Sequence, residues 1–585
     1  MPRNVPAAEM TERPDPVYRF GRFELLTQRR QLLQDGVPVP LGQRAFDLLV
    51  VLVERAGALV TKDELLERAW PGLIVEENNL QVQISGLRKV LGTGAIVTVA
   101  SRGYSFTLAL EAHGVRSAVP DDHVIAVLPL EDLSGRPDEG YFTDGMAEAL
   151  ITDLTKLGGV KVISRGSVIG FKGTREPRAK IGEALGANLI VEGSVLRSGH
   201  RVRISARLVR AATDEHLWAE RYDRELADVL ALQDEVARSI VHAIDKTLRP
   251  RPVVPPRRVD PEVYLLDMRG RHFWHQRTEA GFRAALKAFE EAVLRDPTYA
   301  PAHVGIAESL NMLSNYGLVP PQQIRPASLA AARRALELDD ASADAHRVLA
   351  FCEWQFAFAW ERAMAEYERA LELSPDSSST TYWFGLFLAV VGDFARAHEF
   401  LRRSYVLDPL SRLVPSVQGW AHVFERQYEV ALPFFQHVLS IDPDYHLALW
   451  FQGEALVELG HFDEGIRSLT RAYELGGRTP RLLGYLGYSH GRAGRADRAR
   501  ACLAELEDRA RRGAYVPPYF PALVFSGLGE HDEALAFLEQ AYATGDTMLR
   551  DLKADPHWDR MRALPRFKAL ATKMAFPVWN TASLT

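Results

Sequence analysis

Cysteine is the rarest residue of this sequence, with Cys352 and Cys502 as its two occurrences in 585 residues. Two thiols are too few, and too far apart, for a zinc site or a disulfide framework. Both lie within apolar helical patterns. We therefore expect two buried, reduced side chains and no bound metal.

Long hydrophobic runs are missing as well. The longest apolar segments, residues 48–53 and 384–391, are far shorter than the ~20 residues that a transmembrane helix needs. Residues 1–17 carry charges and prolines without an apolar run, which predicts a disordered tail and excludes a signal peptide. These absences predict a soluble, cytoplasmic protein that does not associate with membranes.

Neither sign of charge is in large excess. The chain has 70 Lys and Arg against 76 Asp and Glu, and its net charge of −6 excludes a uniformly basic nucleic-acid binder. Any DNA-binding surface must therefore be local. The hydrophobic fraction of 47% and the charged fraction of 25% are ordinary for a soluble globular protein. A chain of 585 residues is too long for one hydrophobic core, so we expect several domains.

Catalytic signatures are absent from the sequence. The string GSVIGFKGT at residues 166–174 is similar to a phosphate-binding loop, but Phe171 separates the second glycine from the lysine. Gly173 then stands where the pattern needs Ser or Thr. No nucleophile elbow, dinucleotide fingerprint or zinc spacing occurs either. We expect no enzymatic activity and no cofactor.

Two stretches without hydrophobic periodicity divide the chain. Residues 111–122 (EAHGVRSAVPDD) are polar, and residues 249–259 are rich in proline and arginine, which predicts an extended spacer. The predicted parts are residues 18–110, residues 123–248, a helical region at residues 260–551, and a C-terminal cap and tail at residues 552–585.

The first part combines short strands with three helices. Asp35-Gly36 is a strong hairpin signal, and residues 61–64 form a capping box that opens the second helix. The predicted elements are strands at residues 18–26 and 30–41, helices beginning near residues 45 and 62, a third helix at residues 77–91, and a hairpin at residues 96–108. Two helices, a recognition helix and a hairpin predict a winged helix-turn-helix domain.

Charge is distributed unevenly over this part. The 33 residues from Asn78 to Leu110 contain no Asp or Glu, whereas Arg88, Lys89 and Arg102 are basic. Acidic residues precede this segment, at positions 63, 64, 67, 76 and 77. The asymmetry predicts that the third helix and the hairpin form a positive surface that faces the phosphates of DNA.

Two strings in this segment, ISGLRKVL at residues 84–91 and TVASRGYSF at residues 98–106, resemble the OmpR/PhoB-type winged helix of bacterial transcription regulators. The resemblance extends over about residues 18–108. It implies binding to double-stranded DNA, with the third helix in the major groove and the hairpin, or wing, at the minor groove. Gly86 stands where the family commonly has a basic residue, and Ala100 where the wing often has arginine.

Response regulators of this family carry a phospho-acceptor domain before the winged helix, but only 17 residues precede it here. We therefore expect no regulation by aspartyl phosphorylation of this chain. The signal is expected to enter through the rest of the protein.

The third helix has a polar face opposite an apolar stripe. Its apolar residues are spaced by four, three and four and are expected to face the core: Leu80, Ile84, Leu87 and Leu91. Asn and Gln pair with adenine, and Arg and Lys with guanine or phosphate. The alternative is a solvated face that does not contact DNA. The candidate DNA-binding residues are Asn78, Asn79, Gln81, Gln83, Ser85, Arg88 and Lys89 of the helix, and Thr98, Ser101 and Arg102 of the wing.

The second part predicts a small α/β layer domain. Its patterns follow the order β-α-β-α-β-β-α, with a hairpin that turns at Ser198-Gly199. The strings IAVLPLEDLSG, LIVEGSVLR and HLWAERYD resemble a TolB-like amino-terminal fold over about residues 123–247. We expect Trp218 in the core. Asp144, Glu148 and Asp153 have helical spacing and are expected on a solvated face.

The third part repeats itself with a period of 34 residues. Three sets share fixed phases: Pro375, Pro409, Pro443 and Gly477; Gly385, Gly419, Gly453 and Gly487; and Phe394, Tyr428 and Phe462. Small residues at a fixed phase let two helices approach closely. The pattern resembles the tetratricopeptide repeat, in about eight copies followed by a cap. Such an array offers a concave surface to a protein partner, and the alternative is a passive spacer or a scaffold for homo-oligomers.

These features predict a multidomain, mainly α-helical protein: a winged helix-turn-helix (α+β), a small α/β layer domain and a C-terminal tetratricopeptide-type α-solenoid. The predicted function is a sequence-specific DNA-binding transcription regulator whose repeat array receives a protein partner or a signal. The alternative is a repeat-based adaptor whose winged helix contacts proteins instead of DNA.

Overall fold

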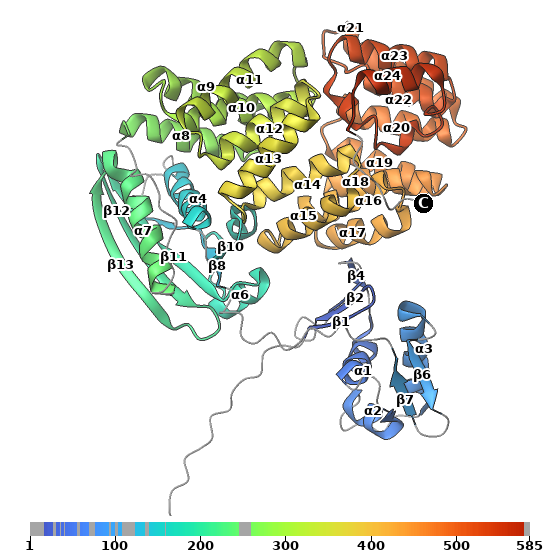
Figure 1. Ribbon diagram of the computed structural model, residues 1–585, viewed down its shortest axis with the longest axis horizontal. Helices are drawn as coiled ribbons and strands as arrows, with labels where there is room; N and C mark the ends of the chain where they lie inside the picture. The colour runs from blue at the N-terminus through green and yellow to red at the C-terminus, as the bar shows by residue number, and fades with distance from the viewer. Residues whose placement is uncertain are drawn as a thin grey trace, which may run out of the picture. The chain divides into compact units, whose positions relative to one another are not determined.

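The computed structural model describes residues 17–26, 31–34, 37–39, 41–54, 59–69, 77–92, 95–99, 103–107, 123–134, 140–157, 160–244 and 259–577. The chain folds into two compact units, residues 1–120 and 121–585 (Figure 1). The linker predicted at residues 111–122 lies outside the described residues, and so does the one at residues 249–259 apart from Val259.

The first unit begins with a four-stranded antiparallel sheet in the order β1-β2-β3-β4. The segment expected as one strand at residues 18–26 is a tight hairpin, because Gly21 turns the chain with a φ of +57° that suits a residue without Cβ. In the hairpin of β3 and β4, Gln34 pairs with Val37, and the turn residues Asp35 and Gly36 lie outside the described ranges. The strands are β1 (Val17–Phe20), β2 (Phe23–Leu26), β3 (Gln31–Gln34) and β4 (Val37–Val39).

Three helices and a three-stranded sheet complete this unit, in the predicted order. They are α1 (Gln43–Glu54), β5 (Leu59–Thr61), α2 (Lys62–Ala69), α3 (Glu77–Leu91), β6 (Ile96–Val99) and β7 (Gly103–Phe106). Thr61 caps α2 as predicted, since its Oγ1 accepts a hydrogen bond from the Glu64 backbone N–H at 3.3 Å. The sequence pattern does not predict β5, which is too short to show alternation and forms by pairing with β7.

The apolar faces that the sequence predicts meet in the core of this unit. The stripe of α3 is buried and so is that of α1: Leu80, Ile84, Leu87 and Leu91, and Ala45, Leu48, Leu49 and Leu52. Phe20 and Phe106 join the two sheets, with their ring centroids 5.0 Å apart in an edge-to-face contact. α3 is therefore fixed on one side and turns its other side outward.

The second unit opens with a sheet in the order β10-β8-β11-β12-β13, with β9 pairing to β11. The predicted hairpin is confirmed, because Gly199, with a φ of +59°, links β11 to β12. α4 and α7 contact each other and the same sheet (Figure 1). The elements are β8 (Val124–Val127), β9 (Glu131–Asp132), α4 (Gly140–Leu157), β10 (Lys161–Val162), α5 (Arg165–Val168), α6 (Arg178–Leu185), β11 (Leu189–Ser198), β12 (Arg201–Arg210), β13 (His216–Glu225) and α7 (Val229–Ile244).

Two expectations for this sheet region are wrong. Asp144 and Glu148 do not lie on a solvated face, because α8 (Pro261–Trp274) packs on α4. Asp144 is 9% exposed and pairs with Lys172 at 2.6 Å. Burial raises the pKa of Glu148, but the neighbouring His275 outweighs that effect and, with two nearby arginines, lowers the pKa to about 2. Trp218 is half-buried on the edge strand β13 rather than in the core.

Sixteen helices, α8 to α23, follow as eight consecutive pairs (Figure 1). This is the helical-repeat architecture that the 34-residue period predicts. After α8 they are α9 (Glu279–Arg295), α10 (Ala300–Asn315), α11 (Pro321–Leu338), α12 (Ala343–Phe356), α13 (Trp360–Leu373), α14 (Ser378–Val391), α15 (Phe394–Leu407), α16 (Leu413–Phe424), α17 (Tyr428–Ile441), α18 (His446–Glu458), α19 (Phe462–Leu475), α20 (Pro480–Arg492), α21 (Ala496–Arg511), α22 (Tyr519–Leu528) and α23 (His531–Ala543). Across the described ranges, no helix is long and apolar enough to cross a lipid bilayer.

The repeated glycines mark close approaches between the two helices of a pair. A Cβ atom on Gly453 would lie 2.6 Å from Cγ of Leu469, and one on Gly419 would lie 2.5 Å from Cε1 of Phe435. Such distances are far below van der Waals contact, so only glycine fits without moving the partner helix.

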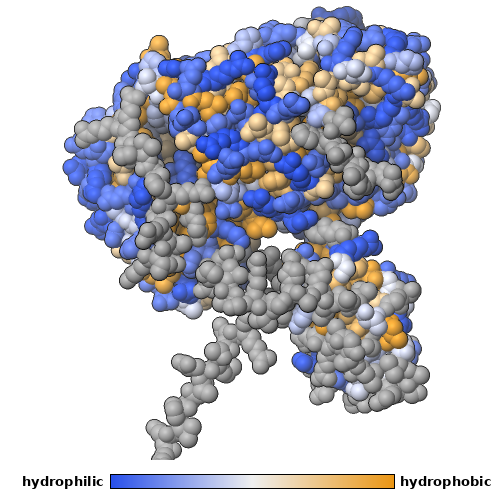
Figure 2. Space-filling model, viewed as in Figure 1, coloured by the Kyte–Doolittle hydropathy of each residue, from blue (hydrophilic) through white to orange (hydrophobic). Residues whose placement is uncertain are grey.

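One apolar core runs through the array from Phe282 of α9 onward and includes both thiols, whereas α8 and most of α9 share the core of the sheet region. Cys352 is fully buried and Cys502 is 8% exposed, as the sequence predicts. Figure 2 shows hydrophobic residues interspersed among hydrophilic ones on the outside of this unit.

The sheet region and the repeats share contacts along the second unit. Tyr264 of α8 packs against Phe142 of α4, with their ring centroids 6.3 Å apart. Farther along the array, the Ser167 hydroxyl donates to Oδ1 of Asp408 at 2.6 Å and accepts from the Leu410 backbone N–H at 2.9 Å. The sheet region is therefore held to the array at its first pair and near the fourth.

The chain after α23 runs back along the array. It contains η4 (Thr547–Asp551), η5 (Pro556–Trp558) and α24 (Pro565–Lys573). Lys553 donates to the Val391 carbonyl at 2.8 Å, and the Trp360 indole donates to the Met574 carbonyl at 2.9 Å. The segment expected to cover the last repeat therefore also contacts pairs in the middle of the array.

Candidate nucleic-acid interface

The outward face of α3 carries most of the predicted helix contacts. Asn79, Gln81, Ser85 and Lys89 are exposed, and Gln83 is half-buried. The side chain of Asn78 lies outside the described residues. Because the opposite face is fixed in the core, these polar side chains share one accessible surface.

Arg88 connects α3 to the wing. Its Nε donates to the Ile96 carbonyl at 2.8 Å, and its Nη2 donates to Oγ1 of Thr98 at 2.7 Å. The guanidinium also lies 5.9 Å from the centroid of the Tyr104 ring. Two of the predicted DNA contacts, Arg88 and Thr98, are therefore bound to each other and set the angle between helix and wing.

The wing tip is defined by the strands on either side of it. Val99 pairs with Gly103, which places Ser101 and Arg102 between β6 and β7. Both of these residues lie outside the described ranges, and their contacts with DNA stay predictions. A Cβ atom on Gly103 would lie 2.0 Å from the Val60 carbonyl oxygen, so glycine is required where β5 packs on the wing.

The charge asymmetry seen in the sequence lies on one part of the fold. The described residues 78–92, 95–99 and 103–107, which form α3 after its first residue Glu77 and the strands of the wing, contain no carboxylate side chain. α2, by contrast, begins with acidic residues in its first turns. The positive charges of Arg88 and Lys89 are therefore not offset by a carboxylate on the described part of α3 after Glu77 or on the wing strands.

Val82 is a potential contact that the sequence interpretation leaves out of the candidate residues. Its side chain is 59% exposed on the outward face of α3. An apolar side chain at such a position can contact the methyl group of thymine. The signal in the sequence is a β-branched apolar residue on the polar side of an amphipathic helix.

Comparison with known proteins agrees with this geometry. The family described as "Transcriptional regulatory protein, C terminal" matches residues 36–106, and the family described as "Tetratricopeptide repeat" matches residues 452–515. The resemblance to the OmpR/PhoB-type winged helix and that to tetratricopeptide repeats are confirmed. The TolB-like resemblance of residues 123–247 stays a prediction.

Three similar proteins illustrate the range of relatives. "Putative adenylate cyclase 3" of Rhizobium meliloti is 36% identical over 257 residues, which cover 43% of this chain and 43% of that protein. "Transcriptional regulator HilA" of Salmonella typhimurium is 22% identical over 422 residues, or 68% of this chain and 71% of that protein. The solved DNA-binding domain of Escherichia coli CadC is 30% identical, with a TM-score of 0.16, and covers 16% of this chain and 95% of that structure. The chain thus spans less than half the length of the first of these relatives.

The N-terminal unit is a winged helix-turn-helix domain of the kind found in transcription regulators, and the C-terminal part consists of tetratricopeptide-type repeats.

Proposed function

We propose that this protein is a sequence-specific, DNA-binding transcription regulator, in which α3 reads the major groove and the repeat array receives a signal or a protein partner. The observation that carries the proposal is the polar outward face of α3, which has no acidic residue after Glu77 and to which Arg88 fixes the wing. In a winged helix, this face meets base edges while the wing contacts the neighbouring backbone.

The predicted contacts divide into two chemical roles. Asn79, Gln81 and Gln83 carry amides that pair with adenine, so we assign them to base reading together with Ser85 and Asn78. Lys89 and Arg102 are assigned to phosphates, one on the helix and one at the wing tip. Arg88 and Thr98 are assigned to positioning of the wing, and Ser101 to a phosphate contact beside Arg102.

The proposed regulator binds rather than catalyses. One relative is named as a putative adenylate cyclase, yet its match covers 43% of that protein. HilA, which matches 68% of this chain, is named as a transcriptional regulator. Incubating the full chain with ATP and Mg²⁺ or Mn²⁺ should produce no cyclic AMP. Turnover above that of a heat-inactivated sample would contradict this part of the proposal.

Genomic fragments retained by the full-length protein test the main proposal directly. Sheared DNA should yield enriched fragments that share a motif. A protein with Asn79→Ala and Gln83→Ala should keep its fold but lose the enrichment. A matched protein with Arg402→Ala, an exposed residue of α15, should behave as the unmodified chain. If no fragment is enriched although the protein is folded, the adaptor function replaces the regulator.

A further inference from the structure

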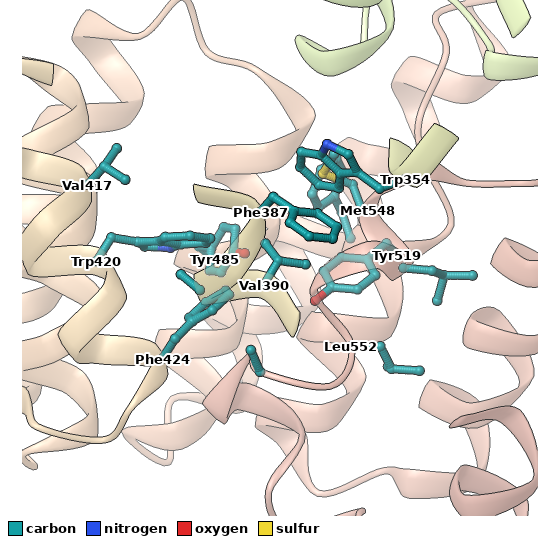
Figure 3. Packing of buried hydrophobic residues seen from close by; sticks show 14 of the residues in the cluster. Trp354, Phe387, Val390, Val417, Trp420, Phe424, Tyr485, Tyr519, Met548 and Leu552 are labelled. Carbon is teal, nitrogen blue, oxygen red and sulfur yellow. The ribbon is translucent and has the colours of Figure 1, made fainter. Parts of the chain in front are cut away.

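A cavity of about 200 Å³ opens into the repeat array, and its walls are aromatic. The first helix of each of five successive pairs, α12 to α20, contributes at least one large ring: Trp354, Trp383, Trp420, Trp450 and Tyr485. The ring centroids of Trp450 and Tyr485 are 5.1 Å apart. Figure 3 labels three of these five residues, Trp354, Trp420 and Tyr485. These walls offer flat surfaces on which another ring can stack.

The C-terminal segment closes one side of this cavity. Met548, Arg550 and Asp551 of η4 are part of the lining. Arg550 is held there by two hydrogen bonds of 2.8 Å, from Nη1 to Oε1 of Gln355 and from Nη2 to Oδ1 of Asn315. The cavity is therefore built from helices of the array and from a segment that returns to it, rather than being a gap between neighbouring repeats.

The charged groups of the lining are mainly cationic. Arg277, Arg481 and Arg550 face a single carboxylate, that of Asp551. Within the described parts of the chain, neither Arg277 nor Arg481 forms an ion pair with a carboxylate. Burial lowers the pKa of Arg481, and the positive charge of Arg550 lowers it further. Arg550 is buried, Arg481 is half-buried and Arg277 is exposed. Cations that are withdrawn from water are stabilised by an anion, and the lining supplies only Asp551.

The two arginines without carboxylate partners contact aromatic rings and sulfur atoms, and Arg481 also contacts one backbone carbonyl. The Arg277 guanidinium lies 3.8 Å from the centroid of the Trp274 ring, and Nη1 is 3.6 Å from Sδ of Met312. Arg481 lies 5.6 Å from the Trp450 ring, and its Nη2 donates to the Asn315 carbonyl at 2.5 Å and to Sδ of Met548 at 3.1 Å. Within the described chain, Nε and Nη1 of Arg481 and Nε and Nη2 of Arg277 donate to no protein acceptor, so both guanidinium groups keep donors for a ligand.

Two polar atoms of the lining lack a hydrogen-bond partner. Oδ1 of Asp551 and Nε of Arg550 are buried without one in the described chain, and they are 3.5 Å apart. The two atoms form an ion pair with each other, so the charge of Asp551 is directed at Arg550 rather than at Arg481 or Arg277.

We propose that this cavity binds a small aromatic carboxylate. The ring stacks among the tryptophans, the carboxylate accepts hydrogen bonds from Arg481, and the exposed Arg277 pairs with it from the opening. An engineered apolar cavity of about 150 Å³ holds benzene, so about 200 Å³ admits one ring with a short acidic arm. A free small molecule fits this size, and a long peptide or a nucleic acid does not.

Binding of such a ligand is measured without DNA, so this inference and the DNA-binding function can fail separately. Phenylacetate, phenylacetamide and 2-phenylethylamine have the same ring and differ in charge. With the full-length protein, calorimetry and tryptophan fluorescence should give saturable 1:1 binding of phenylacetate. The amide and the amine should bind at least about tenfold more weakly, because they lose the charge-assisted bonds to the arginines. Acetate, which has no ring, should not bind.

Variants assign the binding to this cavity. R481M should weaken phenylacetate binding by about tenfold or more. R277Q removes the other arginine proposed to pair with the carboxylate. Because Arg277 is exposed, this variant should fold even if R481M does not. L447W fills the cavity from the half-buried Leu447 and should abolish binding. R402M, on the outside of α15, is the matched control and should bind as the unmodified protein.

Four results would overturn the assignment. One is the absence of phenylacetate binding at millimolar concentration, and another is binding that R277Q and L447W leave unchanged. A third is preference for the amine, which would mean that Asp551 rather than the arginines selects the ligand. A peptide ending in phenylalanine presents the same ring and carboxylate, and tighter binding of that peptide would show that the occupant is a chain terminus instead.

Discussion

Replacing Arg88 by alanine separates its structural role from a role in phosphate binding. The change removes the hydrogen bonds to the Ile96 carbonyl and to Oγ1 of Thr98, of 2.8 and 2.7 Å. The bond to Ile96 is partly buried and the bond to Thr98 is exposed. A hydrogen bond contributes about 1 kcal/mol, so the wing should lose at most about 2 kcal/mol of local stability. A loss of that size corresponds to roughly a 30-fold change in an equilibrium constant.

Hydrogen exchange followed by mass spectrometry measures this loss in the intact protein. Peptides that cover β6 and the end of α3 should exchange about 30-fold faster in Arg88→Ala. Thr98→Val removes one of the two bonds and should increase the rate of exchange roughly fivefold. Lys89→Ala is the matched control, because the neighbouring Lys89 is exposed, and it should leave the exchange unchanged.

The same variants are then compared on DNA. Lys89→Ala should lower the salt slope of binding by about one unit, whereas Arg88→Ala should lower affinity with a smaller change in slope. Unchanged exchange in Arg88→Ala, combined with a full unit of lost slope, would refute the positioning role and make Arg88 a phosphate contact.

Three further predictions concern the helix surface, the repeats and pH. Gly86→Arg should stabilise α3 by about 0.5–1 kcal/mol in thermal unfolding and raise DNA affinity with a steeper salt slope, because a Cβ atom there meets open space. Gly453→Leu should cost the array about 1–3 kcal/mol in urea unfolding, since the new side chain collides with Leu469, and should leave DNA affinity intact. Buried Glu454 has its pKa raised from 4.5 to about 8 by burial, so the folded state holds a proton that the unfolded state releases. Its contribution to the free energy of unfolding is present at low pH and is lost as pH rises through about 8. Burial lowers the pKa of His557, but the effect of Asp555 is opposite and the pKa is raised from 6.5 to about 9. The contribution of His557 to the free energy of unfolding is therefore also lost as pH rises. Unfolding temperatures should therefore fall between pH 6 and pH 9, and less steeply in Glu454→Gln.

Each of these predictions has an outcome that contradicts it. Weaker DNA binding by Gly86→Arg would mean that this part of α3 packs against the DNA without room for a side chain. If Gly453→Leu reduced DNA affinity and array stability equally, the two units would unfold together. A pH dependence identical in Glu454→Gln and the unmodified protein would assign the titration to other groups.

The sequence predicts most of the winged helix because its information is local. The spacing of Leu80, Ile84, Leu87 and Leu91 identifies the buried stripe of α3, and that stripe alone determines which face is outward. The role of Arg88 is not visible in this way. Its partners Ile96 and Thr98 reach it only when the wing folds back on the helix, so a residue on the helix flank is interpreted as a DNA contact.

The repeats show the same division between local and long-range information. The 34-residue period predicts the pairing of helices, because glycines such as Gly453 recur where two helices touch. The aromatic cavity leaves no such signal, since Arg277 and Arg550 are brought together only by the winding of the array and the return of η4. The burial of Asp144 and Glu148 also depends on α8, which follows them by more than a hundred residues.

The measurement that tests the central claim most directly compares Gln83→Ala with Lys89→Ala on two duplexes at several salt concentrations. One duplex carries the enriched genomic motif, and the other is a random sequence of equal length. Gln83→Ala should cost about 1–3 kcal/mol on the motif and little on the random duplex. Lys89→Ala should weaken both alike, with a salt slope lower by about one unit. Equal weakening of both duplexes by Gln83→Ala, or a slope that Lys89→Ala leaves unchanged, would contradict the account that α3 reads DNA with its outward face.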